Sequence, residues 1–155
     1  MPASPTDVDV LTQLLGRPPR ADFDIVVRTA SGEPLVIRNA PLLLDGTPMP
    51  TRYWLVDPDV ARAVAQLESA GGVRSAEAAV DPDDLRVAHD AYAAERDAAL
   101  DPAHIGPRPS GGVGGTRTGV KCLHAHYAYV LAGGIDPVGD WVEAQLAAEV
   151  AGETP

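Results

Sequence analysis

The stretch FDIVVRTASGEPLVIRN, residues 23–39, decides the fold class. Residues 23–29 and 34–39 are rich in β-branched side chains, and the four residues between them include the serine and glycine typical of a hairpin connection. We therefore predict an antiparallel pair of strands. Residues 52–56, which contain a tyrosine and a tryptophan and follow a proline-punctuated loop, predict a third strand.

Helices are predicted before and after these strands. Ser4 or Thr6 can cap a short amphipathic helix that ends at Gly16. Asp57 and Asp81 each precede a proline, and an aspartate N-cap followed by proline is a strong start signal for a helix. The sequence therefore predicts an α+β fold, in which a small antiparallel sheet of about three strands in the N-terminal half packs against four to five helices. The first predicted helix runs from its cap to Leu15, and the second runs from residue 58 to the glycines at 71 and 72. The others cover residues 82 to about 100, 119–131 and 137–150.

The composition is that of one ordinary globular domain. Of 155 residues, 45% are hydrophobic and 22% are charged, so we expect a single domain over residues 1–155 with short flexible termini. The net charge of −10 makes nucleic acid and acidic membrane surfaces poor candidates as partners. No stretch approaches the roughly 18 apolar residues of a membrane span, and no secretory signal is recognisable, so a cytoplasmic location is expected. The single cysteine, Cys122, excludes an intramolecular disulfide and a cysteine-rich zinc site, and we expect neither a metal nor a cofactor.

A long connection rich in proline and glycine, residues 102–119, is of a length that is typical of functional or mobile loops. It leads into the predicted helix 119–131, and a glycine-rich loop before a helix start offers free backbone N–H groups to an anion. With Thr118 as N-cap, the only lysine of the chain, Lys121, would share a helical face with His124, and Arg117 could fold over the same end. The pattern is not a P-loop, so it gives no support to nucleotide hydrolysis. The alternative is a flexible surface loop whose charges face water.

Catalytic candidates are weak, and the sequence leaves open whether the protein is an enzyme. Cys122 and His124 are the candidates, and the spacing of Cys122 and His126 would place a thiol and an imidazole on one helical face. A lone cysteine in an alanine-rich helix is more often a small buried hydrophobic residue. A stripe of His89, Tyr92 and Arg96 could form a polar wall of the same pocket, although a solvated helix face is the more usual interpretation.

Four motifs carry a family resemblance: residues 15–20, 40–51, 120–124 and 136–140. From about residue 14 to 140 the chain resembles the bacterial family called domain of unknown function 501, whose members occur in high-G+C bacteria and have no assigned reaction. The resemblance implies genes near a septum-formation-initiator-like protein, enolase and an exopolyphosphatase, which suggests a link to division or phosphate metabolism.

The resemblance also bears on metal binding. It implies that relatives carry cysteines where this chain has Thr29, Ser31 and Asp57, which with the cysteine matched by Cys122 would form a four-sulfur metal site. Three of those cysteines are absent here, so no metal site is expected. A family histidine is likewise replaced by Tyr129.

The function predicted first is a small module that binds an anion, a phosphate-bearing small molecule. Arginine forks, an ammonium and an imidazole are suitable donors for phosphate oxygens. The alternative is a non-enzymatic interaction or scaffold protein linked to cell division, with a cell-division protein as its partner and with arginines that pair with Asp45 or Asp140. The predicted ligand-binding residues are Arg17, Arg20, Arg52, Arg117, Lys121 and His124.

Overall fold

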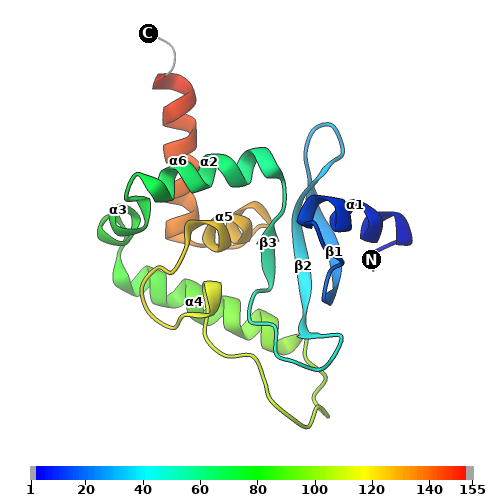
Figure 1. The fold of residues 1–155 in the computed structure, drawn as a ribbon. Helices are drawn as coiled ribbons and strands as arrows, with labels where there is room; N and C mark the ends of the chain where they lie inside the picture. The colour runs from blue at the N-terminus through cyan, green and yellow to red at the C-terminus, as the bar shows by residue number, and fades with distance from the viewer. Residues whose placement is uncertain (1–2, 153–155) are drawn as a thin grey trace.

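The computed structural model, which describes residues 3–152, confirms the α+β prediction with an antiparallel sheet in the N-terminal half (Figure 1). The sheet has the strand order β1-β2-β3, so β1 and β3 are its edges. The β1–β2 hairpin turns at Gly32, whose φ of 91° lies in the left-handed region that glycine adopts without strain. The strands are β1 (Ala21–Arg28), β2 (Pro34–Leu43) and β3 (Tyr53–Leu55).

The sheet lies between α1 on one face and the other helices on the opposite face (Figure 1). Strand alternation produces this arrangement because neighbouring side chains point to opposite faces. Val36 and Tyr53 pack into the large cluster beneath the helix layer. Phe23 and Ile37 pack with Leu11 of α1 in the smaller cluster.

The helices of residues 3–152 include one that the sequence did not predict. The sequence predicts the glycines at 71 and 72 only as the end of α2, but Gly71 has a left-handed φ of 87° and Gly72 begins α3. A Cβ at Gly72 would lie 2.5 Å from the carbonyl oxygen of Leu67, so the close turn between the two helices requires glycine. The helices are α1 (Pro5–Leu15), α2 (Pro58–Ser69), α3 (Gly72–Ala79), α4 (Pro82–Ala98), α5 (Leu123–Leu131), α6 (Pro137–Gly152) and the 3₁₀ turn η1 (Val113–Gly115). None of these helices has the length and apolarity that crossing a bilayer requires.

Helix α5 begins at Leu123, four residues later than predicted, and Thr118 is not its N-cap. The N-cap position belongs to Cys122, whose side chain does not cap the helix. A carboxylate from α2 does so instead, because the backbone N–H of Leu123 donates to Oε2 of Glu68 at 2.8 Å. Lys121 therefore precedes the helix and does not share a helical face with His124.

The polar stripe on α4 is buried, so its interpretation as a solvated face is wrong. The Tyr92 hydroxyl oxygen accepts the backbone N–H groups of Arg52 and Tyr53, at 2.6 and 3.1 Å. The guanidinium of Arg96, which is 1% exposed, donates to the backbone carbonyls of Pro50, Ser110 and Gly111.

His89 completes this stripe. Its Nδ1 accepts the N–H of Val113 at 3.0 Å, which leaves Nε2 to donate to the carbonyl oxygen of Gly119 at 2.8 Å. Gly112 lies so close to the imidazole that a Cβ there would be 2.6 Å from Nδ1 of His89. The buried face of α4 thus forms hydrogen bonds both to the residues at the start of β3 and to the glycine-rich connection before α5.

Candidate functional site

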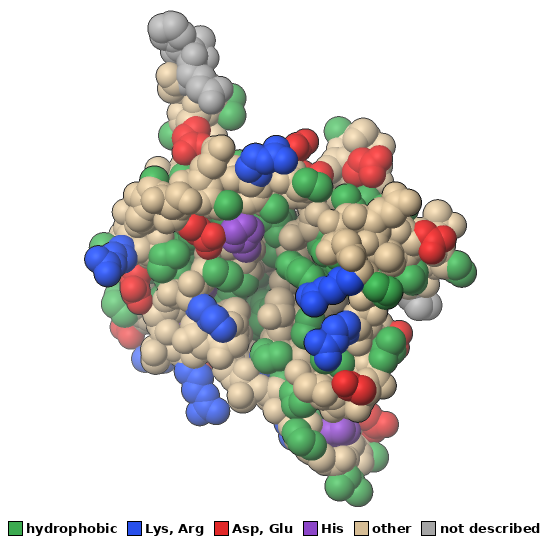
Figure 2. Space-filling model, in the orientation of Figure 1, with side chains coloured by type: hydrophobic (Ala, Val, Ile, Leu, Met, Phe, Trp, Pro, Cys, Tyr) green, Lys and Arg blue, Asp and Glu red, His purple; other side chains and the backbone are tan. Residues whose placement is uncertain are grey.

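Two hollows share Met49 and Trp54 in their linings, and together we call them the Met49–Trp54 groove. The first, of about 320 Å³, lies between β3 and the residues at the start of α5, including Lys121 and His124. The second, of about 180 Å³, lies against the connector between α1 and β1. Figure 2 shows a hollow in this region, with Lys or Arg side chains on both sides and a His beside an acidic side chain at its edge.

Three predicted cations border the groove. Arg17 and Arg20 line it on one side and Lys121 on the other, and all three side chains are exposed. Within residues 3–152 none of them makes an ion pair or a side-chain hydrogen bond. Pro18 and Pro19 fix the backbone between the two arginines, so the position of the guanidinium groups is set by a stiff segment.

Arg20 influences a protein carboxylate, that of Asp45. Hydrogen bonds from Thr47 lower the pKa of Asp45, and the charge of Arg20 contributes to the lowering. Asp45 is exposed and makes no ion pair with Arg20, so the guanidinium remains available to a ligand.

His124 lines the groove but already has two protein partners. Its Nε2 lies 3.0 Å from the carbonyl oxygen of Ala61, and its Nδ1 lies 3.1 Å from Oε1 of Glu68. The other oxygen of Glu68 accepts the Leu123 N–H. The positive end of α5, which the sequence assigned to a ligand anion, is therefore occupied by an internal carboxylate.

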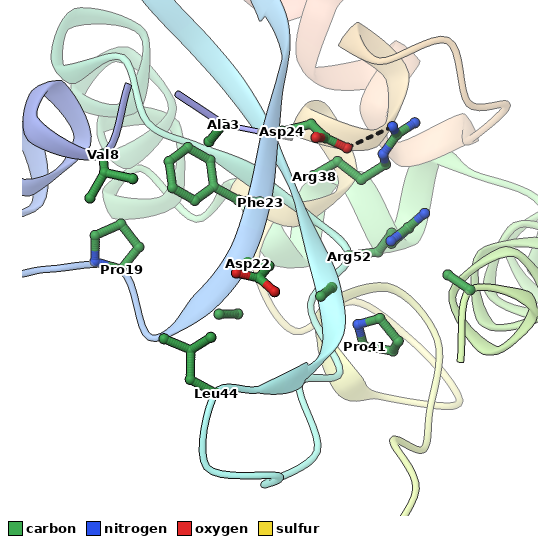
Figure 3. A pocket seen from close by; sticks show the side chains of 13 residues that line it. Ala3, Val8, Pro19, Asp22, Phe23, Asp24, Arg38, Pro41, Leu44 and Arg52 are labelled. Carbon is green, nitrogen blue, oxygen red and sulfur yellow. Dashed lines mark hydrogen bonds and ion pairs between the residues drawn. The ribbon is translucent and has the colours of Figure 1, made fainter. Parts of the chain in front are cut away.

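The remaining two predicted residues lie elsewhere. Arg52 donates from Nη1 to the carbonyl oxygen of Asn39 at 2.8 Å, and its Nε lies 3.5 Å from Oε2 of Glu95. Figure 3 shows Arg52 beside Arg38, which is paired with Asp24 at 2.9 Å, in a hollow that contains both acids and bases. Arg117 lines a separate hollow next to α4. The structure thus brings together Arg17, Arg20, Lys121 and His124 along one groove, but not Arg52 or Arg117.

Cys122 lines the groove at the N-cap position of α5. Burial raises the pKa of its thiol, and the negative charge of Glu68 adds to the rise. Both ring nitrogens of His124 already lie beside protein oxygens, Nε2 at the Ala61 carbonyl and Nδ1 at the Glu68 carboxylate. His126 is fully buried, and its Nδ1 is paired with Asp136 at 2.6 Å.

A raised thiol pKa leads to a test by alkylation. We expect iodoacetamide to modify Cys122 more slowly at neutral pH in the folded protein than in the urea-unfolded chain, because a raised pKa leaves a smaller fraction as thiolate. The folded-state rate should increase as the pH rises towards the thiol pKa. Mass spectrometry of the labelled protein measures both rates. Faster labelling of the folded protein would instead indicate an activated thiolate.

A family model described as "Protein of unknown function (DUF501)" matches residues 25–144. The chain belongs to the DUF501 family. No curated protein and no solved structure gives a significant match. The match includes Trp54 and Lys121 of the groove, whereas Arg17 and Arg20 precede it. Because the family description contains no activity, a function for this DUF501 domain must be argued from its geometry.

Sequence reasoning missed two lining residues of the groove, Met49 and Trp54, and a residue that supports its wall, Glu68. The sequence predicts Trp54 only as a strand residue and Met49 only as part of a loop, yet both line the two hollows. Trp54 belongs to an edge strand, so its indole can reach the groove at the sheet margin. Glu68 was missed because it lies 55 positions from Leu123, and no local signal connects the two.

A buried His–Asp pair lies apart from the groove residues. Nδ1 of His126 donates to Asp136 at 2.6 Å, and the other oxygen of Asp136 accepts the N–H groups of Val138 and Gly139 at the start of α6. Nε2 of His126 is buried without a hydrogen-bond partner among the described residues. Residues 3–152 contain no cluster of three or more His, Cys, Asp or Glu side chains able to hold a metal ion.

Because Asp136 bonds both to His126 of α5 and to the first turn of α6, we interpret the pair as a structural link between these two helices.

Proposed function

We propose that this DUF501 protein binds an anionic small molecule in the Met49–Trp54 groove. The observation that carries the proposal is the set of three exposed cations, Arg17, Arg20 and Lys121, which border one groove and have no ion-pair partner in residues 3–152. The protein as a whole has a net charge of −10, and these three residues gather positive charge around one groove of an acidic protein.

The three cations act on a ligand at short range. Charges farther away than a Debye length of about 8–10 Å are largely screened, so distant acidic residues weaken the attraction of these cations for an anion only slightly. Arginine forks bind two oxygens of a phosphate or carboxylate at once, and lysine adds a compact charge from the opposite side. This geometry supports an anion held between the α1–β1 connector and Lys121.

The apolar lining supports a more specific ligand class. Met49 and Trp54, both partly exposed, separate the cations on the two sides. An indole and a thioether offer a flat, polarisable surface to a ring or an alkyl group. We therefore favour an organic phosphate over inorganic phosphate. In this proposal His124 and Glu68 hold the wall of the groove, and Arg52 and Arg117 have structural or separate roles.

A thermal-shift series tests the proposal. Phosphate, pyrophosphate, short polyphosphate, nucleotides and sugar phosphates are added at fixed ionic strength, and a ligand at about 100 times its dissociation constant should stabilise the native state by about 2.7 kcal/mol. We expect the largest shift with an organic phosphate. The shift should be lost in Lys121→Ala and in the double variant Arg17→Ala/Arg20→Ala.

Arg74→Ala is the matched control, because Arg74 is an exposed arginine of α3 that lines neither hollow of the groove. It should keep the full shift. If no compound stabilises the protein, or if all variants respond as the wild type does, the anion site is wrong.

A further inference from the structure

A second groove, which we call the Ile135 groove, lies between α4 and the turn that joins α5 to α6. Its volume is about 660 Å³. Val87 and Ala91 of α4 line one side, Ile135 and Pro137 line the side of the turn, and Tyr129 and Ala132 of the α5 region also belong to the lining. It shares no lining residue with the Met49–Trp54 groove.

Two aliphatic side chains border this groove in water. Ile135 is 86% exposed and Val87 is 60% exposed, although both are residue types that usually lie inside. The turn holds Ile135 in place, because Gly133 has a left-handed φ of 100° and Gly134 lies directly on the Tyr129 ring, where a Cβ would be 2.3 Å from Cε1. An apolar groove with exposed aliphatic edges is typical of a surface that a partner covers.

The charges around the groove are of one sign. Asp84, Glu95 and Asp140 line it, and no Lys or Arg does. Glu95 lies 3.5 Å from the Arg52 guanidinium, whereas Asp84 and Asp140 make no ion pair in the part of the chain that the structure describes. A bound cation would therefore meet carboxylates whose charge the protein does not neutralise.

We infer that the Ile135 groove is a docking site for a segment of a partner protein that carries aliphatic anchors flanked by Lys or Arg. Anchors that fill an apolar groove supply most of the affinity in such contacts. Complementary charges at the rim increase the association rate and select against acidic segments. The lining has both parts of this pattern: an apolar part that includes Val87 and Ile135, and carboxylates at Asp84 and Asp140. This inference is independent of the anion site.

Three synthetic peptides test the inference by fluorescence anisotropy at physiological ionic strength. One combines leucines with lysines, one combines leucines with glutamates, and one combines serines with lysines. We expect saturable binding of the Leu/Lys peptide only, with NMR shift changes at Val87, Ala91 and Ile135. Binding of the Ser/Lys peptide with equal affinity would mean simple attraction to an acidic protein, and would overturn the inference.

Matched variants locate the site. Ile135→Ser should weaken Leu/Lys binding about tenfold or more, as truncation of a central anchor does. Ile105→Ser should not, because Ile105 is 96% exposed but lines neither groove. The double change Asp84→Lys/Asp140→Lys should slow association and reduce its salt dependence. Asp59→Lys is its control, since Asp59 also stands in the first turn of a helix.

Sedimentation of the protein alone completes the test. We expect the same monomeric behaviour for the wild type and for Ile135→Ser. Self-association that Ile135→Ser abolishes would mean that a second copy of the chain fills the groove, which would contradict a foreign partner. Absence of saturable Leu/Lys binding would also reject the inference.

Discussion

Replacing Arg96 by methionine should lower the free energy of unfolding by about 3–5 kcal/mol, the range for removing one partner of a buried charged network. The guanidinium is 1% exposed and donates to three backbone carbonyls, those of Pro50, Ser110 and Gly111. Methionine fills most of the volume but leaves these acceptors without a donor. Urea denaturation followed by circular dichroism measures the loss.

Arg62→Met is the control for Arg96→Met. Arg62 is 68% exposed and pairs only with Asp59 on the surface, so its replacement should change stability by less than about 1 kcal/mol. Hydrogen exchange adds a local readout, because amides of the 110–119 segment should lose protection in Arg96→Met. Unchanged stability of Arg96→Met would contradict the proposed role of Arg96 in holding this segment.

Replacing Asp136 by alanine should destabilise the fold by about 3–5 kcal/mol, because one fully buried carboxylate serves two elements. It accepts from Nδ1 of His126 on α5 and from the N–H groups of Val138 and Gly139 at the start of α6. The substitution leaves these three donors without an acceptor inside the core. The same urea titration measures the effect.

The control for Asp136 is another N-cap aspartate, Asp57. It accepts only the Val60 N–H at 3.0 Å, so Asp57→Ala should cost about 0.5–2 kcal/mol. A double-mutant cycle of Asp136→Ala with His126→Ala should give a coupling energy of about 1–3 kcal/mol. Additive effects would contradict direct coupling of the two side chains.

The elements that sequence predicted well are those whose signals are local. The Asp-Pro pairs at 57–58 and 81–82 mark the starts of α2 and α4 as the structure has them, because the cap and the first turn are adjacent in the chain. The start of α5 was wrong for the opposite reason, since its capping carboxylate comes from Glu68 on α2. Helix α3 was missed because Gly71 and Gly72 end one helix and begin the next without a spacer.

The difference between local and distant signals also explains how far the site could be predicted. The motifs that resemble the family identify candidate cations, and three of these, Arg17, Arg20 and Lys121, do border one groove. The sequence does not show which of the candidate cations form hydrogen bonds or ion pairs with residues that are distant in the chain. Arg52 is held by Asn39 and Glu95, and its place in the ligand set could be judged only once the fold had brought those residues to it.

The position of α4 has a consequence for communication across the molecule. Its buried stripe, His89, Tyr92 and Arg96, holds the segments that carry the Met49–Trp54 groove, while Val87 and Ala91 on another face line the Ile135 groove. A rigid-body shift of this one helix would move parts of both grooves together. If two occupants prefer different positions of α4, thermodynamic linkage requires each to change the affinity of the other by the same factor.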